Sequence, residues 1–230
     1  MIMSFKIHDK IKSVLRNQGR LSKVVSYFYT LIGLNCIKVR HGNFLTKSGA
    51  YLYKSRIDVK GNNNTILLET GVHLSRFKCF INGNDNIVCI HSDVSGSNLE
   101  IVIDDNHNNV EIGEKTIISG KTHLACIEGT KILIGKESLL SANITMRTGD
   151  SHSVLDLTGK RINYSKDIII GNHVWIGGGV IILKGGYIGD NSIIGAGAVV
   201  TRHFSENNVA VAGNPATIVK KSINWDKKRI

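Results

Sequence analysis

The chain of 230 residues is long enough for one sizeable domain, and its apolar fraction of 42% is ample for a packed core. Its formal net charge of +11 lies at the ends: residues 1–40 hold eight Lys or Arg against one Asp, residues 220–230 hold five against one, and the remainder is balanced. Because this charge is terminal and no aromatic–basic stacking motif accompanies it, we expect no nucleic-acid partner.

The first forty residues form a separate segment. Apolar residues recur at helical spacing between Lys and Arg as far as about residue 33, which predicts a basic amphipathic helical segment over residues 1–40. Two roles stay open for it, a cap on the domain that follows or docking on an anionic membrane surface. Without a signal-peptide pattern or a membrane-spanning run, we expect a cytoplasmic protein, peripheral at the inner membrane face if the segment docks there.

A repeat of six residues dominates the domain predicted over residues 41–214. Neither a helix, with 3.6 residues per turn, nor an alternating strand keeps a period of six, whereas a hexapeptide β-helix does. Between residues 55 and 110 the period is lost in Asn- and Gly-rich segments, which we interpret as the degraded register of a terminal coil. The clearest aliphatic positions are Ile170, Ile176, Ile182, Ile188, Ile194 and Val200.

A polar stretch breaks this repeat. The residues "MRTGDSHSVLDLTGKRINYSKD", from Met146 to Asp167, have the composition of a solvated loop with a histidine near its start. We therefore expect a protruding loop insertion over residues 147–167. Residues 215–230 are expected to form a basic C-terminal tail.

The run "IGNHVWIGGGVIILKGGYIGDNSIIGAGAVVT", followed by "VAGNPATIVK", resembles the left-handed parallel β-helix acyltransferases. It is most similar to the branch of bacterial sugar, capsule and lipopolysaccharide O-acetyltransferases, over residues 110–225. The resemblance implies an all-β solenoid, acetyl-CoA as co-substrate, and a homotrimer with active sites between subunits. It also implies direct transfer to a glycan or glycolipid acceptor.

The resemblance assigns catalytic roles to three residues. His152, in "GDSHSV", takes the place of the general base, and a neutral imidazole suits the removal of a proton from a hydroxyl near pH 7. Asp150 is expected to orient that ring or hold its proton. The backbone N–H of Gly178 takes the place of the donor to the thioester oxyanion. His173, close to the tryptophan motif, is the alternative base.

Six further residues fall where the family binds its cofactor. The resemblance places Trp175 on the pantetheine arm, Asn143 near the thioester and Ala196 beside the pantetheine. It places Thr201 and Arg202 near the nucleotide end. Lys220 falls where the family has a basic residue that meets the phosphates, where a cation suits the anionic cofactor.

The expected function is transfer of an acetyl group to a sugar hydroxyl of a bacterial surface polysaccharide or its precursor. Amino-sugar N-acetylation uses the same base and cofactor and stays open, as does a non-catalytic glycan-binding scaffold. The zinc carbonic anhydrases of the same fold need three histidine ligands, two of them close in the chain. His152 has no such neighbour, and the four cysteines form no CxxC pair, so we expect no metal.

Overall fold

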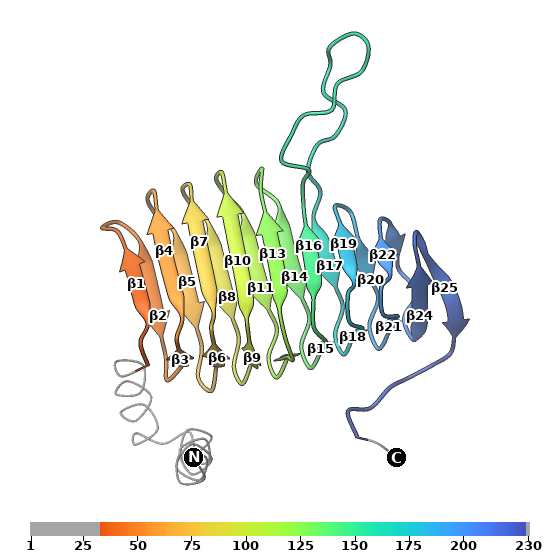
Figure 1. Ribbon diagram of the computed structural model, residues 1–230, viewed down its shortest axis with the longest axis horizontal. Coiled ribbons are helices and arrows are strands. Elements are labelled where there is room, and N and C mark those ends of the chain that lie inside the picture. Colours follow the sequence, from red (N-terminus) through yellow and green to blue (C-terminus); the bar gives the residue numbers. More distant parts are fainter. Residues whose placement is uncertain (1–32, 229–230) are drawn as a thin grey trace.

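The structure is a computed structural model that describes residues 33–228. The chain winds into a solenoid whose coils stack along one axis, with one long loop projecting from an edge (Figure 1). The helical segment expected over residues 1–40 lies almost wholly outside the described residues. None of the described residues forms a helix long and apolar enough to cross a membrane.

Three sheets form the faces of the solenoid, and each coil adds one strand to each sheet. Sheet A contains β1 (Cys36–Val39), β4 (Arg56–Lys60), β7 (Lys78–Asn82), β10 (Leu99–Asp104), β13 (Thr122–Cys126), β16 (Ile144–Arg147), β19 (Ile181–Leu183) and β22 (Val199–Val200). Sheet B contains β2 (Phe44–Lys47), β5 (Thr65–Leu68), β8 (Ile87–Ile90), β11 (Asn109–Ile112), β14 (Lys131–Ile134), β17 (Ile168–Ile170), β20 (Tyr187–Ile188) and β23 (His203–Phe204). Sheet C contains β3 (Tyr51–Tyr53), β6 (His73–Ser75), β9 (Ser95–Ser97), β12 (Ile117–Ile118), β15 (Leu139–Leu140), β18 (Trp175–Ile176), β21 (Ile193–Ile194), β24 (Val209–Gly213) and β25 (Ala216–Lys221).

The expected β-helix is confirmed. Neighbouring strands pair in parallel throughout the three sheets, apart from the antiparallel pair of β24 and β25. The six aliphatic positions of the hexapeptide repeat, from Ile170 to Val200, are all at most 2% exposed. Each hexapeptide therefore supplies one short strand with one inward side chain, and the stacked aliphatic side chains form the core.

The interpretation of residues 55–110 as a degraded terminal coil is wrong. These residues form complete coils of 22 residues, as the pairing of Thr65 with Ile87 and of Ile87 with Asn109 shows. In the C-terminal coils the step is 18 residues, for example from Ile181 to Val199. The longer coil explains why a search for a period of six fails there, although the same three sheets continue through it.

The extra residues of the longer coils lie at the corner between sheets A and B, where they form a ladder of asparagines. Asn64, Asn86 and Asn108 are at most 1% exposed, and each side-chain oxygen accepts bonds from the next coil. Asn86 donates its backbone N–H and its side-chain amide to Asn64 Oδ1, both at 3.0 Å. The asparagine-rich turns thus satisfy buried polar groups that would otherwise be costly.

The long loop leaves the solenoid at this same corner, between β16 and β17 (Figure 1). At the other end of the chain, residues 216–221, which the sequence groups with the C-terminal tail, form β25 and pair with β24. After β25 the chain returns along sheet C and buries the side chain of Trp225, which is 9% exposed.

Candidate active site

The base of the long loop is held by one buried asparagine. The side-chain amide of Asn163 donates to the carbonyl oxygen of His152 at 2.8 Å and to Asp150 Oδ2 at 2.9 Å. Its Oδ1 accepts the backbone N–H of Val154 at 2.8 Å. Asn163 is only 8% exposed. Because these bonds join the outgoing and returning segments of the loop, they fix the backbone that carries His152.

Asp150 and Lys184 attach the loop to the next coil. Lys184, directly after β19, forms an ion pair with the Asp150 carboxylate and donates to the carbonyl oxygen of Asn163 at 3.1 Å. The hydrogen bond from Lys184, followed by that from Asn163, holds the pKa of Asp150 below its ordinary value. The structure therefore places the Asp150 carboxylate with Lys184 and Asn163, and it supports the histidine through the loop backbone.

A second ionic contact ties the loop to the preceding coil. The guanidinium of Arg161 lies 2.7 Å from Glu128, and the Ser165 hydroxyl donates to the same carboxylate at 2.7 Å. The hydrogen bond from Ser165 is the largest contribution, with Arg161 beside it, to lowering the pKa of Glu128. Both coils that flank the insertion thus hold it.

His152 itself is exposed, and within residues 33–228 its imidazole makes no hydrogen bond or ion pair. Its ring nitrogens are consequently free to bind a substrate hydroxyl or a group of a second protein chain. Its neighbour Ser151 accepts a hydrogen bond from Arg147, at the end of β16, at 2.8 Å. The histidine is therefore held by its backbone and presented with a free side chain.

The three glycines after β18 form a corner between sheets C and A. The N–H of Gly177 bonds to Ile194 and that of Gly179 to Ala142, at 2.8 and 2.9 Å. Among the described residues the N–H of Gly178, between them, has no partner. A Cβ on Gly178 would lie 3.6 Å from the Ala142 carbonyl oxygen, an ordinary contact, so glycine here leaves room outside the backbone rather than relieving a clash.

The same corner repeats one coil on, at Ala196. Gly195 and Gly197 donate to Val211 and Gly178, while the N–H of Ala196 has no partner among the described residues. One coil back, Asn143 is exposed at this corner with a φ of +59°. The structure therefore brings Asn143, Gly178 and Ala196 to the same corner of three successive coils, in one row along an edge of the solenoid, and the N–H groups of Gly178 and Ala196 are unpaired among the described residues.

Trp175 and His173 occupy an aromatic cluster with Trp225. The imidazole of His173 stacks on Trp225 at a centroid distance of 4.3 Å, and its Nδ1 lies 3.2 Å from Asn191 Oδ1. Trp225 donates its indole N–H to the His173 carbonyl oxygen at 2.8 Å. His173 is therefore occupied in packing, which weakens the alternative assignment of the base. Trp175, 39% exposed, keeps an open face beside this cluster.

The remaining sequence-predicted cofactor residues lie towards the C-terminal coils. Thr201 and Lys220 are exposed, and the Arg202 guanidinium lies over Phe204 and donates to the Ala216 carbonyl oxygen at 3.3 Å. Lys221, beside Lys220, pairs with Glu206 at 2.7 Å. Thr201 and Arg202 lie between β22 and β23, at the corner between sheets A and B, and Lys220 lies on β25 in sheet C. One protomer therefore does not bring these residues into the row of Asn143, Gly178 and Ala196.

One protomer does not bring the loop and this row together. Gly178 precedes β19, whereas Lys184, which binds the loop, follows it, so the two lie at opposite ends of the strand. Six residues of extended chain span roughly 20 Å, far beyond hydrogen-bonding reach. Figure 1 shows the loop projecting away from the edge at which β15 and β18 lie.

Sequence reasoning missed Asn163, Lys184 and Trp225. Asn163 and Trp225 lie in polar or charged stretches, and Lys184 is a single cation between an apolar strand and two glycines, so no sequence pattern distinguishes them. Their importance depends on contacts made across 11, 34 and 52 residues of chain.

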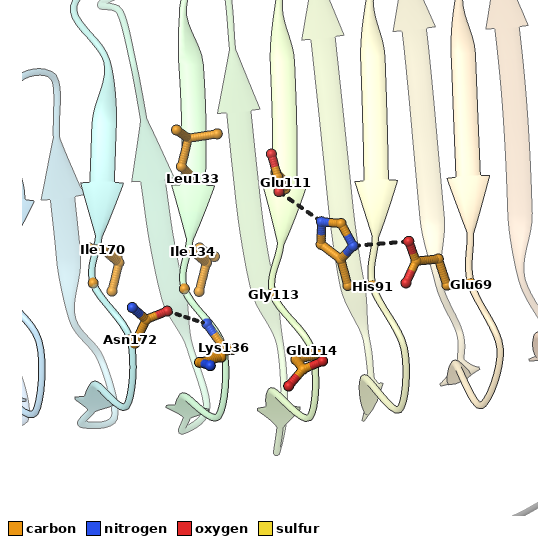
Figure 2. Close-up of a pocket in the computed structure, with 12 residues that line it drawn as sticks. Glu69, His91, Glu111, Gly113, Glu114, Leu133, Ile134, Lys136, Ile170 and Asn172 are labelled. Carbon is orange, nitrogen blue, oxygen red and sulfur yellow. Dashed lines mark hydrogen bonds and ion pairs between the residues drawn. The ribbon is translucent and has the colours of Figure 1, made fainter.

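A separate polar cluster lies on sheet B, in a shallow hollow shown in Figure 2. His91 lies between Glu69, 3.1 Å from Nδ1, and Glu111, 2.7 Å from Nε2. Glu69, Cys89 and His91 each offer an atom that could bind a metal ion, and these atoms lie within 4.8 Å of one another. However, both imidazole nitrogens already bond to carboxylates, and burial together with the two glutamates raises the pKa of Cys89 to about 11. We interpret the cluster as an ionic ladder between coils.

Comparison with known proteins agrees with the fold. The family model for the bacterial transferase hexapeptide (six repeats) matches residues 167–202. Two solved structures superpose over most of the chain: the polySia specific acetyltransferase NeuO, with a TM-score of 0.79 at 30% identity, covers 84% of this chain and 89% of its own. The polysialic acid O-acetyltransferase OatWY, with a TM-score of 0.73 at 33% identity, covers 85% and 89%.

The chain therefore belongs to the hexapeptide-repeat acyltransferases, and within them it is similar to bacterial polysaccharide and sugar O-acetyltransferases. The galactoside O-acetyltransferase of Lactococcus lactis subsp. lactis (strain IL1403) is 38% identical over 116 residues, covering 50% of this chain and 54% of its own. The polysialic acid O-acetyltransferase of Neisseria meningitidis is 35% identical over 121 residues, covering 52% of this chain and 56% of its own. The matched region spans about half the length of these curated relatives.

Proposed function

We propose that the protein is an acetyl-CoA-dependent O-acetyltransferase that acetylates a sugar hydroxyl of a surface polysaccharide or its precursor, with His152 as general base. The observation that carries the proposal is the loop that holds the backbone of His152 through Asn163 while leaving its imidazole unpaired among the described residues. Family membership and the relatives named as acetyltransferases support it.

The reaction follows from these groups. The acceptor oxygen attacks the thioester carbonyl carbon while the imidazole of His152 takes the hydroxyl proton. The backbone N–H of Gly178, unpaired within the described chain, stabilises the developing oxyanion, a contribution of about 3 kcal/mol for one such donor. The carbon–sulfur bond then breaks, and the imidazolium returns the proton to the CoA thiolate.

Direct transfer agrees with the state of the cysteines. A covalent acyl-enzyme would need an accessible thiolate. Cys79 and Cys126 are buried, and burial raises the pKa of Cys79 to about 12. Cys89 and the exposed Cys36 lie on coils that precede the row of Gly178 by at least two coils.

A homotrimer would complete the site. Within one protomer His152 and Gly178 lie at opposite ends of sheet A, so the base of one protomer needs the Gly178 corner of a neighbour. The exposed apolar side chains of the loop, including Leu157 and Tyr164, support contact with another copy.

Complementation between inactive variants tests the proposal. His152→Ala removes the base, and Gly178→Asp places a negative charge at the oxyanion position without a steric clash. Thiol release from acetyl-CoA is measured with polysialic acid, neutral polysaccharides and amino sugars. Each variant alone should be inactive, whereas co-expressed variants should recover about a quarter of wild-type activity, because mixed trimers rebuild some intact sites. No turnover by the wild type on any acceptor would favour a glycan-binding scaffold, and turnover on amines alone would favour N-acetylation.

A further inference from the structure

A groove rich in cations lies on the N-terminal coils, at the corner between sheets C and A. It has a volume of about 400 Å³. Among its lining residues in the described chain, five carry positive charge and only Glu100 carries negative charge. The cations are Lys54, Arg56, Arg76, Lys78 and Lys121.

The cations form two columns that follow the stacking of the coils. Arg56 and Lys78 are paired across β4 and β7, and Glu100 continues that column on β10. Lys54 and Arg76 occupy the preceding corner, at φ values of +50° and +54°. Neighbouring coils are about 4.8 Å apart, and the corner column runs Lys54, Arg76, the neutral Asn98 and Lys121, so its cations follow one edge with one uncharged step.

Arg56 pairs with Asp58 at 3.5 Å and Lys78 pairs with Glu100, so three of the five cations have no ion pair within the described residues. Glu100 is bound by Lys78 at 3.4 Å and by His123 at 3.0 Å. Within residues 33–228, Arg76 and Lys121 form no ion pair, and both are exposed. Lys54 lies over the ring of Tyr53 at 5.4 Å, which holds its ammonium at the surface. The groove consequently carries an unbalanced positive charge that is open to solvent.

This edge continues into the candidate active site. Backbone hydrogen bonds link the corner of each coil to the next: Arg76 to Tyr53, Ile144 to Lys121, and Gly179 to Ala142, at 2.7 to 3.0 Å. Asn143, and then the corner formed by Gly178 and Gly179, are therefore the next two positions of this edge after Lys121. At about 4.8 Å per coil, Gly178 lies roughly 10 Å from Lys121 along the axis.

We propose that this groove binds an anionic polysaccharide along the edge between sheets C and A, and so delivers its acceptor residue to the row of Asn143 and Gly178. The inference rests on the proposed function and specifies its substrate class. A linear polyanion fits this row, because the cations lie in a narrow groove parallel to the axis. A membrane surface would instead favour cations spread over a broad face.

Charge reversal with a matched control tests the groove. The full-length Arg76→Glu/Lys121→Glu variant is compared with wild type and with Lys131→Glu/Lys136→Glu, which makes the same charge change on exposed residues of sheet B. The probes are long-chain polysialic acid, its carboxyl-reduced neutral form and phosphatidylserine vesicles. Binding is measured by titration calorimetry without acetyl-CoA at low and moderate salt, and KM and kcat by thiol release.

The groove variant should bind long polysialic acid roughly tenfold more weakly at low salt, because two attractive contacts become repulsive. Its KM should rise with kcat unchanged, while the control stays within about twofold of wild type. Equal effects in both variants, equal wild-type binding of the neutral chain, or loss of vesicle binding alone would each overturn the proposal. Charge-dependent binding without thiol release would support the binding groove and contradict the proposed transferase activity. Acetyl transfer that is unchanged in the groove variant would support the transferase activity and contradict the binding groove.

Discussion

The side-chain amide of Asn163 donates to the carbonyl oxygen of His152 at 2.8 Å, across eleven residues of chain. This bond joins the returning strand of the loop to the residue proposed as base. The histidine is thereby fixed through its backbone, and its ring keeps both nitrogens available. The position of the His152 backbone thus depends on the buried side-chain amide of Asn163.

Replacing Asn163 by alanine should therefore impair catalysis through position. We expect kcat/KM to fall by about ten- to a hundredfold, because displacement of a reacting group by about 1 Å has effects of that size. Thiol-release kinetics measure the loss. Thr158→Ala, at the exposed end of the same loop, serves as the control and should stay close to wild type. Equal effects of the two substitutions would contradict a specific role for Asn163.

The ion pair of Asp150 with Lys184 should make the free energy of unfolding fall at acid pH. Lys184 and Asn163 lower the pKa of Asp150 in the folded protein, so the pair stabilises the fold above the unfolded value of about 3.9. That contribution is lost as pH falls through the lower folded pKa. Urea unfolding of Asp150→Asn should consequently show a smaller loss of stability between about pH 5 and the acid limit. Lys184→Met should have the same effect, and the double variant should add little to it. An unchanged acid profile in both variants would contradict the pairing.

The asparagine ladder should contribute to the stability of the N-terminal coils. Asn86→Ala removes the oxygen that accepts the buried Asn108 backbone N–H at 2.9 Å and one of the bonds of the Asn108 side-chain amide. We expect the free energy of unfolding to fall by about 1–3 kcal/mol. Asn106→Ala, at an exposed position of the corresponding turn in the next coil, should change it by less than about 0.5 kcal/mol. Denaturant titration of both variants checks the difference, and similar values would argue against burial as its cause.

The cluster of Glu69, His91 and Glu111 should make the stability of the fold fall as pH rises, which is opposite in sign to the effect of the Asp150–Lys184 pair. Burial alone would lower the pKa of His91, but the hydrogen bonds that its imidazolium donates to Glu111 and Glu69 outweigh burial and raise the pKa. The imidazolium therefore stabilises the fold below the unfolded pKa of about 6.5, and this contribution is lost as pH rises through the higher folded value. Thermal unfolding of His91→Gln should lose this dependence near neutral pH. A wild-type profile that is flat over this range would contradict the arrangement.

The sequence predicted the coils after Ile170 well, because each inward Ile or Val recurs at the same six-residue interval. It misread residues 55–110, because four extra residues at one corner change the period while the buried asparagines keep the coils in register. The histidine of the loop was identifiable by its polar surroundings. The clamp by Asn163 and the support from Lys184 were not, since those contacts exist only once distant coils are stacked.

Thiol release from acetyl-CoA by His152→Ala, measured beside wild type with an accepted glycan, tests the central claim most directly. We predict a loss of about 10² to 10⁴ in kcat, with acetyl-CoA binding and the unfolding profile unchanged, because a general base contributes a factor of that size. Wild-type turnover in the variant would contradict the assignment of His152 as the base.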